Sequence, residues 1–146
     1  MPPTQSAAPK KTMQQRIMEH LQKNDRIETL YSLADNLSAP LKAVTEIAYK
    51  LVKSRDVRAW REGPAVFYEA MEPSVRDALR QLDGSTMGHD VDFCSTFSGR
   101  SRHNTLAALE RAVFLGLATK HEREWCDQYP AGYRTIYRAV PPTLYE

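Results

Sequence analysis

One short stretch of the chain, residues 99–105, concentrates side chains that can bind nucleic acid. After its leading glycine, every side chain in it can donate a hydrogen bond: Arg100, Ser101, Arg102, His103, Asn104 and Thr105. Arginine pairs bidentately with guanine and asparagine with adenine, while serine and threonine bind phosphate oxygens. If a helix begins here, its dipole adds to the attraction for the phosphate backbone. The stretch therefore predicts DNA contact, although a solvated helix start would use the same residue types.

A second group of candidates lies in the first half of the chain. Lys42, Thr45 and Lys50 fall on the polar side of an expected helix, where they could contact DNA phosphates. Leu41 and Glu46 lie on the same side and weaken its fit to an anion. DNA contact and a surface for a protein partner are therefore both open interpretations of this helix.

Two expected β-hairpins supply further cations. Arg58 and Arg61 flank Trp60 in the first hairpin, and Lys120 lies in the second. Each of these cations could contact phosphate, but acidic residues such as Glu122 oppose the charge of the second hairpin. The hairpins by themselves do not decide the function.

The chain repeats a helix-turn-helix pattern. Residues 33–38 (Leu-Ala-Asp-Asn-Leu-Ser) match residues 93–98 (Phe-Cys-Ser-Thr-Phe-Ser) in kind, sixty positions later. The small residues Ala34 and Cys94 are expected where two helices cross closely. Leu37 and Phe97 are expected to fill the corner under the turn, and Ser38 and Ser98 to cap the following helix.

The elements that must position these residues recur in the same order. Apolar residues at three-and-four spacing mark helices over 13–23 and 73–82 and after each motif, for example at 44, 47, 48, 51 and 52. β-Branched and aromatic residues predict hairpins that pair residues 57–60 with 66–71, and 117–120 with 133–140. The expected organisation is a disordered tail at 1–12, a first unit at 13–72, a second unit at 73–142 and a C-terminal tail at 143–146.

This order resembles the winged helix-turn-helix superfamily, in two tandem copies. The resemblance rests on the motifs at 33–38 and 93–98, each with its following helix and hairpin. It implies a mainly α fold with small β-hairpins (α+β). It also implies that the helix after each turn enters the DNA major groove and that the hairpin lies on the backbone or minor groove. The same scaffold also serves in protein-binding modules.

Composition excludes several classes of protein. The 146 residues are 42% hydrophobic and 26% charged, with a formal net charge of +2, which fits neither a polycationic condenser nor an acidic disordered chain. No apolar run approaches the roughly 20 residues that span a bilayer, and the N-terminus lacks the apolar core of a secretory signal. Two cysteines are too few for a disulfide framework, so reduced thiols in the cytoplasm are expected.

Catalytic signatures are missing from the sequence. It contains no glycine-rich phosphate loop, His-Glu-x-x-His helix or nucleophile elbow. Cys94, Cys126 and the four scattered histidines do not form close metal-ligand pairs. We therefore expect no enzyme activity, no cofactor and no metal.

The leading hypothesis is a cytoplasmic, sequence-specific DNA-binding regulator of transcription, of the kind found in phages or plasmids. Under this hypothesis, phosphates of double-stranded DNA are bound by Lys42, Lys50, Arg58 and Arg61. The bases are read by a second set of residues: Arg100, Arg102 and Asn104. One alternative is a protein–protein adaptor or inhibitor on the same scaffold, and another is a replication or partition protein. A homodimer or another protein partner is compatible with each, and no membrane association is expected.

Overall fold

The structure is a computed structural model that describes residues 10–23, 25–127 and 130–145. Within these residues the chain has six helices and two small antiparallel sheets, a mixed α+β fold. It divides into two compact units, described separately below. Unit 1 comprises residues up to Lys53, Val57–Ala70 and Leu144–Glu146, and unit 2 comprises Ser54–Asp56 and Met71–Thr143. Most of the expected tail at 1–12 lies outside the described residues.

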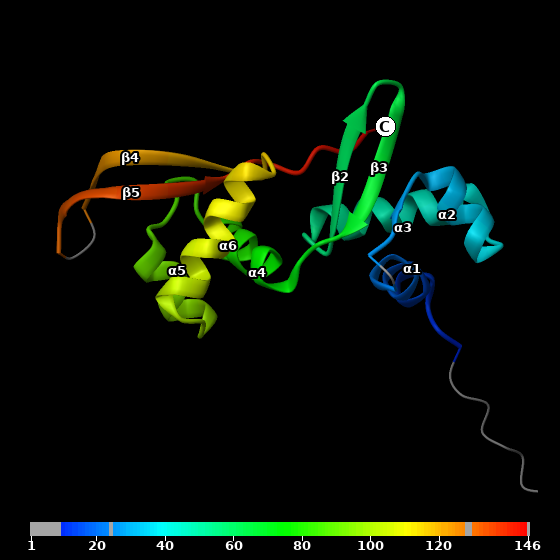
Figure 1. Cartoon of the computed structure of the whole chain (residues 1–146), viewed down its shortest axis with the longest axis horizontal. Coiled ribbons are helices and arrows are strands. Elements are labelled where there is room, and N and C mark those ends of the chain that lie inside the picture. Colours follow the sequence, from blue (N-terminus) through cyan, green and yellow to red (C-terminus); the bar gives the residue numbers. More distant parts are fainter. Residues whose placement is uncertain (1–9, 24, 128–129, 146) are drawn as a thin grey trace, which may run out of the picture. The chain divides into compact units, whose positions relative to one another are not determined.

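Unit 1 contains three helices and a three-stranded sheet (Figure 1). The sheet has the order β1-β3-β2, with both pairings antiparallel. The strand β1, which the sequence analysis did not predict, pairs Glu28 with Tyr68 of β3. The elements of the unit are α1 (Met13–Gln22), β1 (Ile27–Glu28), α2 (Leu30–Leu37), α3 (Leu41–Lys53), β2 (Val57–Glu62) and β3 (Ala65–Ala70).

Local sequence explains where these helices start and which face they bury. Thr12 caps α1 in a reciprocal capping box with Gln15, and Thr29 caps α2 by accepting from the Ser32 amide. The apolar stripe predicted within α3 faces the core, where Val44 and Leu51 are fully buried. Burial of this stripe is the main stabilisation of the helix.

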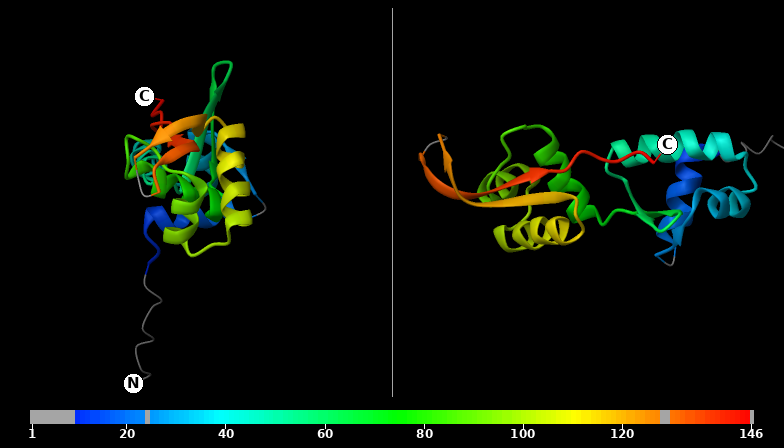
Figure 2. Two further views of the ribbon diagram at one scale, coloured as in Figure 1. Left: turned by 90° about the vertical axis from the view of Figure 1, so that its left-hand side faces the viewer. Right: turned by 90° about the horizontal axis from the view of Figure 1, so that it is seen from above.

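Unit 2 has three helices and a long two-stranded hairpin. The hairpin extends beyond the ends of the helices α5 and α6 in both Figure 1 and Figure 2. It is longer than expected because a bulge between His121 and Glu124 lets pairing continue through a strongly polar segment. The elements are α4 (Pro73–Asp83), α5 (Val91–Ser98), α6 (Arg102–Phe114), β4 (Ala118–Cys126) and β5 (Gly132–Ala139).

The two units correspond at an offset of 61 residues, not the sixty that the letter pattern predicted. The N-caps Thr29 and Asp90 are 61 apart, and so are the left-handed C-caps Ser38 and Gly99. At this offset Leu33 corresponds to Cys94, and both are fully buried. The sixty-residue alignment was therefore wrong by one position.

This shift corrects two expectations about unit 2. Phe97 does not fill the corner under the turn, since 64% of its surface is exposed. Ser98 does not cap α6 either: its hydroxyl accepts from the Arg100 amide, whereas Ser101 is the N-cap. A helix places successive side chains about 100° apart, so an alignment error of one residue moves a side chain out of the core.

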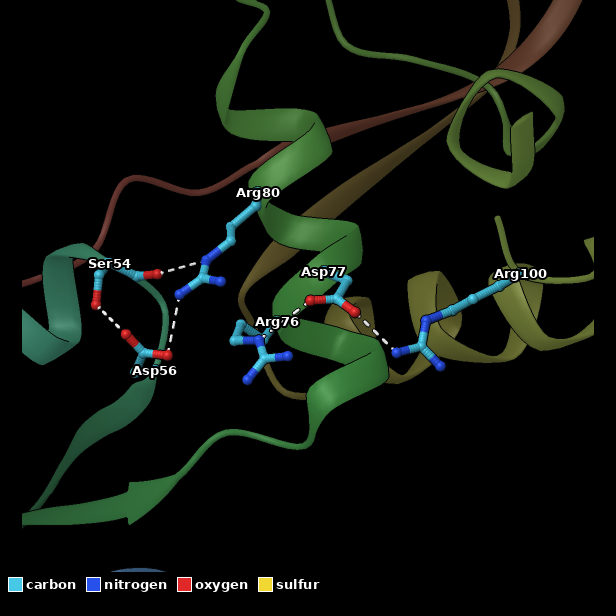
Figure 3. Close-up of polar contacts among 6 residues, drawn as sticks. All are labelled: Ser54, Asp56, Arg76, Asp77, Arg80 and Arg100. Atoms are coloured by element: carbon cyan, nitrogen blue, oxygen red, sulfur yellow. Dashed lines mark hydrogen bonds and ion pairs between the residues drawn. The ribbon is translucent and has the colours of Figure 1, made fainter. Parts of the chain in front are cut away.

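The segment Ser54–Asp56 is held against α4 by a polar network (Figure 3). Arg80 of α4 donates to the Ser54 carbonyl at 2.9 Å and to the Asp56 carboxylate at 2.9 Å. Arg55, of which only 2% is exposed, donates twice to Asp83. These bonds attach the segment to unit 2.

No helix among the described residues is both long enough and apolar enough to span a membrane.

Candidate nucleic-acid interface

The first turn of α6 presents polar side chains to solvent, and hydrogen bonds and caps define the turn before it. Gly99 adopts φ +71°, a left-handed conformation that ends α5. The Ser95 hydroxyl then donates to the Arg100 carbonyl at 2.8 Å, and Ser101 accepts from the Asn104 amide. Arg102, His103 and Asn104 follow on exposed positions. The structure thus brings three of the predicted residues together at one helix start, with Ser101 acting as its cap.

Arg100 is directed toward α4. Its guanidinium donates to the Asp77 carboxylate at 2.8 Å, as Figure 3 shows. Partial burial would raise the pKa of Asp77, but hydrogen bonds from Arg100 and Arg76 hold this pKa below its usual value. Asp77 is therefore ionised at neutral pH, and Arg100 would have to leave it before contacting a base.

Thr105 was wrongly expected to contact DNA. It is buried, and its position corresponds to the core residue Val44 of unit 1. Its hydroxyl has no hydrogen-bond partner among the described residues. Burying a hydroxyl without a hydrogen-bond partner costs free energy. Thr105 therefore fills space in the core but lowers the stability of unit 2.

Replacement of Thr105 by valine is expected to raise the free energy of unfolding of unit 2 by about 1 kcal/mol, because it removes an unpaired buried hydroxyl without changing the volume much. Thermal unfolding followed by circular dichroism measures the effect. Ser101→Ala is the comparison: loss of the N-cap should cost about 1 kcal/mol. A valine variant that is less stable than the unmodified chain would contradict this assignment.

The exposed face of α6 includes a cation that the sequence analysis missed. His103, Ala107 and Arg111 are exposed at successive four-residue intervals, so Arg111 lies on the same face as His103. Its guanidinium lies 5.7 Å from the ring centre of Phe114 and 3.4 Å from the Glu72 carboxylate. The four-residue spacing from His103 was the signal that could have identified it.

The exposed face of α3 in unit 1 carries two lysines, with the exposed Glu46 four residues from each of them. Lys42 and Lys50 are exposed, and neither forms an ion pair among the residues that the structure describes. Thr45 is half-buried and donates its hydroxyl to the Leu41 carbonyl at 2.8 Å. The structure therefore places these three candidates on one helix, with the two lysines available for phosphate.

The candidate cations of the hairpins differ in their surroundings. Arg58 lies 4.0 Å from the ring centre of Trp60 and donates to Glu69, whereas Arg61 is exposed. Lys120 forms an ion pair with Glu110 at 2.7 Å, and this hydrogen bond raises the pKa of the lysine. Lys120 is accordingly less available to a ligand than Arg61.

The two units differ in how many of their candidate cations are paired with carboxylates. Unit 2 holds more candidate residues, but carboxylates accompany its cations: Asp77 binds Arg100, and Asp92 binds the exposed Arg102 at 3.0 Å. In unit 1, Lys42 forms no ion pair among the described residues, although the exposed Glu46 lies four residues away. Phosphate attraction is therefore stronger on α3, while donors suited to base edges are concentrated on α6.

Other reactive groups lie away from these surfaces. Burial raises the pKa of the Cys94 thiol to about 11, so the thiolate that would act as a nucleophile is scarce at neutral pH. Cys94 packs in the core of unit 2 as a small apolar residue. Among the described residues, no cluster of three or more His, Cys, Asp or Glu side chains is arranged to hold a metal ion.

Comparisons with known proteins add little to this geometry. No protein-family model matches the chain, and no curated protein matches it. Among solved structures, it is similar to the bacterial selenocysteine-specific elongation factor EF-Sec, at 17% sequence identity and a TM-score of 0.32. The match covers 88% of this chain and 18% of that chain. A TM-score this low does not establish a shared fold.

Proposed function

We propose that the chain is a sequence-specific DNA-binding regulator built from two winged-helix units. The observation that carries the proposal is the exposed first turn of α6, where Arg102, His103 and Asn104 follow a tight helix-to-helix turn. In unit 1 the helix at the corresponding position, α3, exposes Lys42 and Lys50. Both helices are followed by a hairpin, as the winged-helix arrangement requires.

The residues have different roles in this proposal. Lys42, Lys50 and Arg61 bind phosphates and set the position of the protein on the duplex. Arg102 and Asn104 hydrogen-bond to base edges and provide sequence preference. Arg102 exchanges its surface partner Asp92 for the DNA, which costs little because exposed ion pairs contribute at most about 1 kcal/mol.

Binding to labelled genomic DNA fragments is expected to weaken steeply as salt increases. Each phosphate contact contributes about 0.9 to the slope of log affinity against log salt, so the three contacts give roughly a fortyfold loss between 50 and 200 mM. Lys42→Gln and Lys50→Gln should each reduce the slope by about one, because each removes one phosphate contact. Lys23→Gln, an equal charge change on an exposed residue after α1, should leave the slope unchanged.

The base-reading role has a separate test. Once a preferred site has been selected from the fragments, Arg102→Ala should lower its affinity by about 1–3 kcal/mol while affinity for random DNA changes less. Absence of DNA binding at 50 mM salt by a folded chain would overturn the proposal.

A protein–protein adaptor is the second candidate function. Large apolar side chains are exposed on unit 2: Phe97, Phe114, Trp125 and Tyr133. Exposed aromatic residues are frequent in protein interfaces. Retention of a specific protein by the unmodified chain but not by a Phe97→Ser or Phe114→Ser variant, together with no DNA binding, would favour this function.

A further inference from the structure

An apolar groove on unit 1 is lined by α2, α3 and the β2–β3 hairpin. It has a volume of about 500 Å³. Four of its lining residues are tyrosines, and three of them come from separate helices and strands: Tyr31, Tyr49 and Tyr68. Tyr31 is 73% exposed, and Leu41 at the other side of the groove is also exposed. The groove is therefore open to solvent and only partly filled.

Two residues from far along the chain pack onto unit 1 at or near this groove. Leu144 packs against the core of unit 1, and Tyr145 lines the groove itself. The Tyr49 hydroxyl donates to the Tyr145 carbonyl at 3.0 Å. Both residues belong to unit 1 by their contacts, although the residues just before them belong to unit 2. We call Leu144 and Tyr145 the strap.

The strap contacts one residue that the proposed function assigns to DNA. The Arg61 guanidinium lies 5.2 Å from the centre of the Tyr145 ring, within range of a cation–π interaction. Thr45 lines the same groove. The Arg61 side chain would have to leave this contact to direct its N–H donors toward a DNA phosphate, so the tyrosine would limit its access.

We propose that the strap is an autoinhibitory element that reduces DNA binding by unit 1. This inference rests on the proposed function, because it concerns the regulation of the same surface. The strap is suited to displacement: it consists of two residues, attached by one hydrogen bond, one exposed cation–π contact and the packing of Leu144. None of the helices and strands of unit 1 includes a residue of the strap, so we expect them to persist when it leaves.

The first experiment compares DNA affinity of the full chain with that of Tyr145→Ala and of a chain that stops after Thr143. Both variants should bind labelled duplex DNA about two- to fivefold more tightly, the size of effect expected from one exposed cation–π contact. Tyr145→Phe is the matched control, because it retains the ring over Arg61 and the carbonyl that binds Tyr49. It should bind like the unmodified chain. Thermal unfolding shows that each variant is folded.

The second experiment tests the docking of the strap without DNA. A synthetic peptide of residues 141–146 is added to the chain that stops after Thr143, and amide chemical shifts are recorded. We expect saturable shifts at Thr45, Tyr49 and Arg61, which lie around the groove, and loss of the extra DNA affinity when the peptide is present.

The outcomes separate this inference from the proposed function. DNA binding that stays unchanged or weakens in a folded Tyr145→Ala variant overturns autoinhibition, and a peptide that shifts no groove residue overturns docking. If no form of the chain binds DNA, the proposed function fails and autoinhibition fails with it. In that case the peptide shifts alone decide whether the strap docks.

Discussion

Replacement of Asp83 by alanine is expected to lower the free energy of unfolding of unit 2 by about 3 kcal/mol. Arg55 is fully buried, and Asp83 accepts two of its hydrogen bonds, at 2.9 and 2.8 Å. Arg55 also donates to the Val140 carbonyl at 2.7 Å. Without Asp83 the buried guanidinium has no ion-pair partner among the described residues, and removing one partner of such a pair typically costs about 3–5 kcal/mol. Because 36% of the Asp83 side chain is exposed, water offsets part of this cost.

The measurement uses amide hydrogen exchange in α4 and α6, with α1 and α3 of the same chain as an internal reference. Protection should fall in α4 and α6. Arg80→Ala is the matched control, because the pair between Arg80 and Asp56 is exposed and should contribute less than about 1 kcal/mol. Equal losses of protection in the two variants would show that the buried pair stabilises unit 2 no more than the exposed pair does.

Replacement of Gly88 by alanine is expected to destabilise unit 2 by about 3 kcal/mol or more. Gly88 has φ +81°, a conformation that costs a residue with a Cβ about 1–2 kcal/mol. The added Cβ would also lie 2.4 Å from the Tyr137 carbonyl oxygen, which cannot move without breaking the bridge between His89 and Tyr137. Overpacking of this kind adds about 1–3 kcal/mol.

The control for Gly88 is Gly99→Ala. Gly99 also has a positive φ, +71°, but a Cβ there would have no atom within 4 Å. Only the backbone cost of about 1 kcal/mol is expected. In thermal unfolding Gly88→Ala should therefore lower the Tm by more than about 10 °C, and Gly99→Ala by clearly less. A similar shift for both would show that unit 2 accommodates the methyl group at Gly88.

Local patterns were sufficient to predict most helices and both hairpins. Apolar residues such as Val44, Leu51 and Leu109 recur at the helical period, and all three are buried. The stretch that contains Tyr68 has the β-branched and aromatic composition of a strand, and it forms β3. These signals are local, because propensity and periodicity depend on residues within a few positions of one another.

Several features depended on contacts between distant residues and could not be predicted. The strand β1 has two residues and forms only because Glu28 can pair with Tyr68, forty positions later. The correct offset between the units depends on which residues cap each helix and which of its residues are buried. The phenylalanines at 93 and 97 resemble the leucines at 33 and 37 and favoured the incorrect offset of sixty. The positions of Thr105 in the core and of Phe97 on the surface follow from that offset.

The candidate DNA-binding residues illustrate the same division. Their types and clustering were evident in the sequence, since donors such as Arg102 and Asn104 are adjacent in the chain. Their availability was decided by the tertiary structure: Arg100 is bound by Asp77 of α4, while Lys42 forms no ion pair among the described residues. An ion pair requires two side chains within about 4 Å, and only folding brings together groups 23 positions apart, such as Arg100 and Asp77. The sequence thus determined which residues could bind DNA, and the tertiary structure decided which of them are accessible to it.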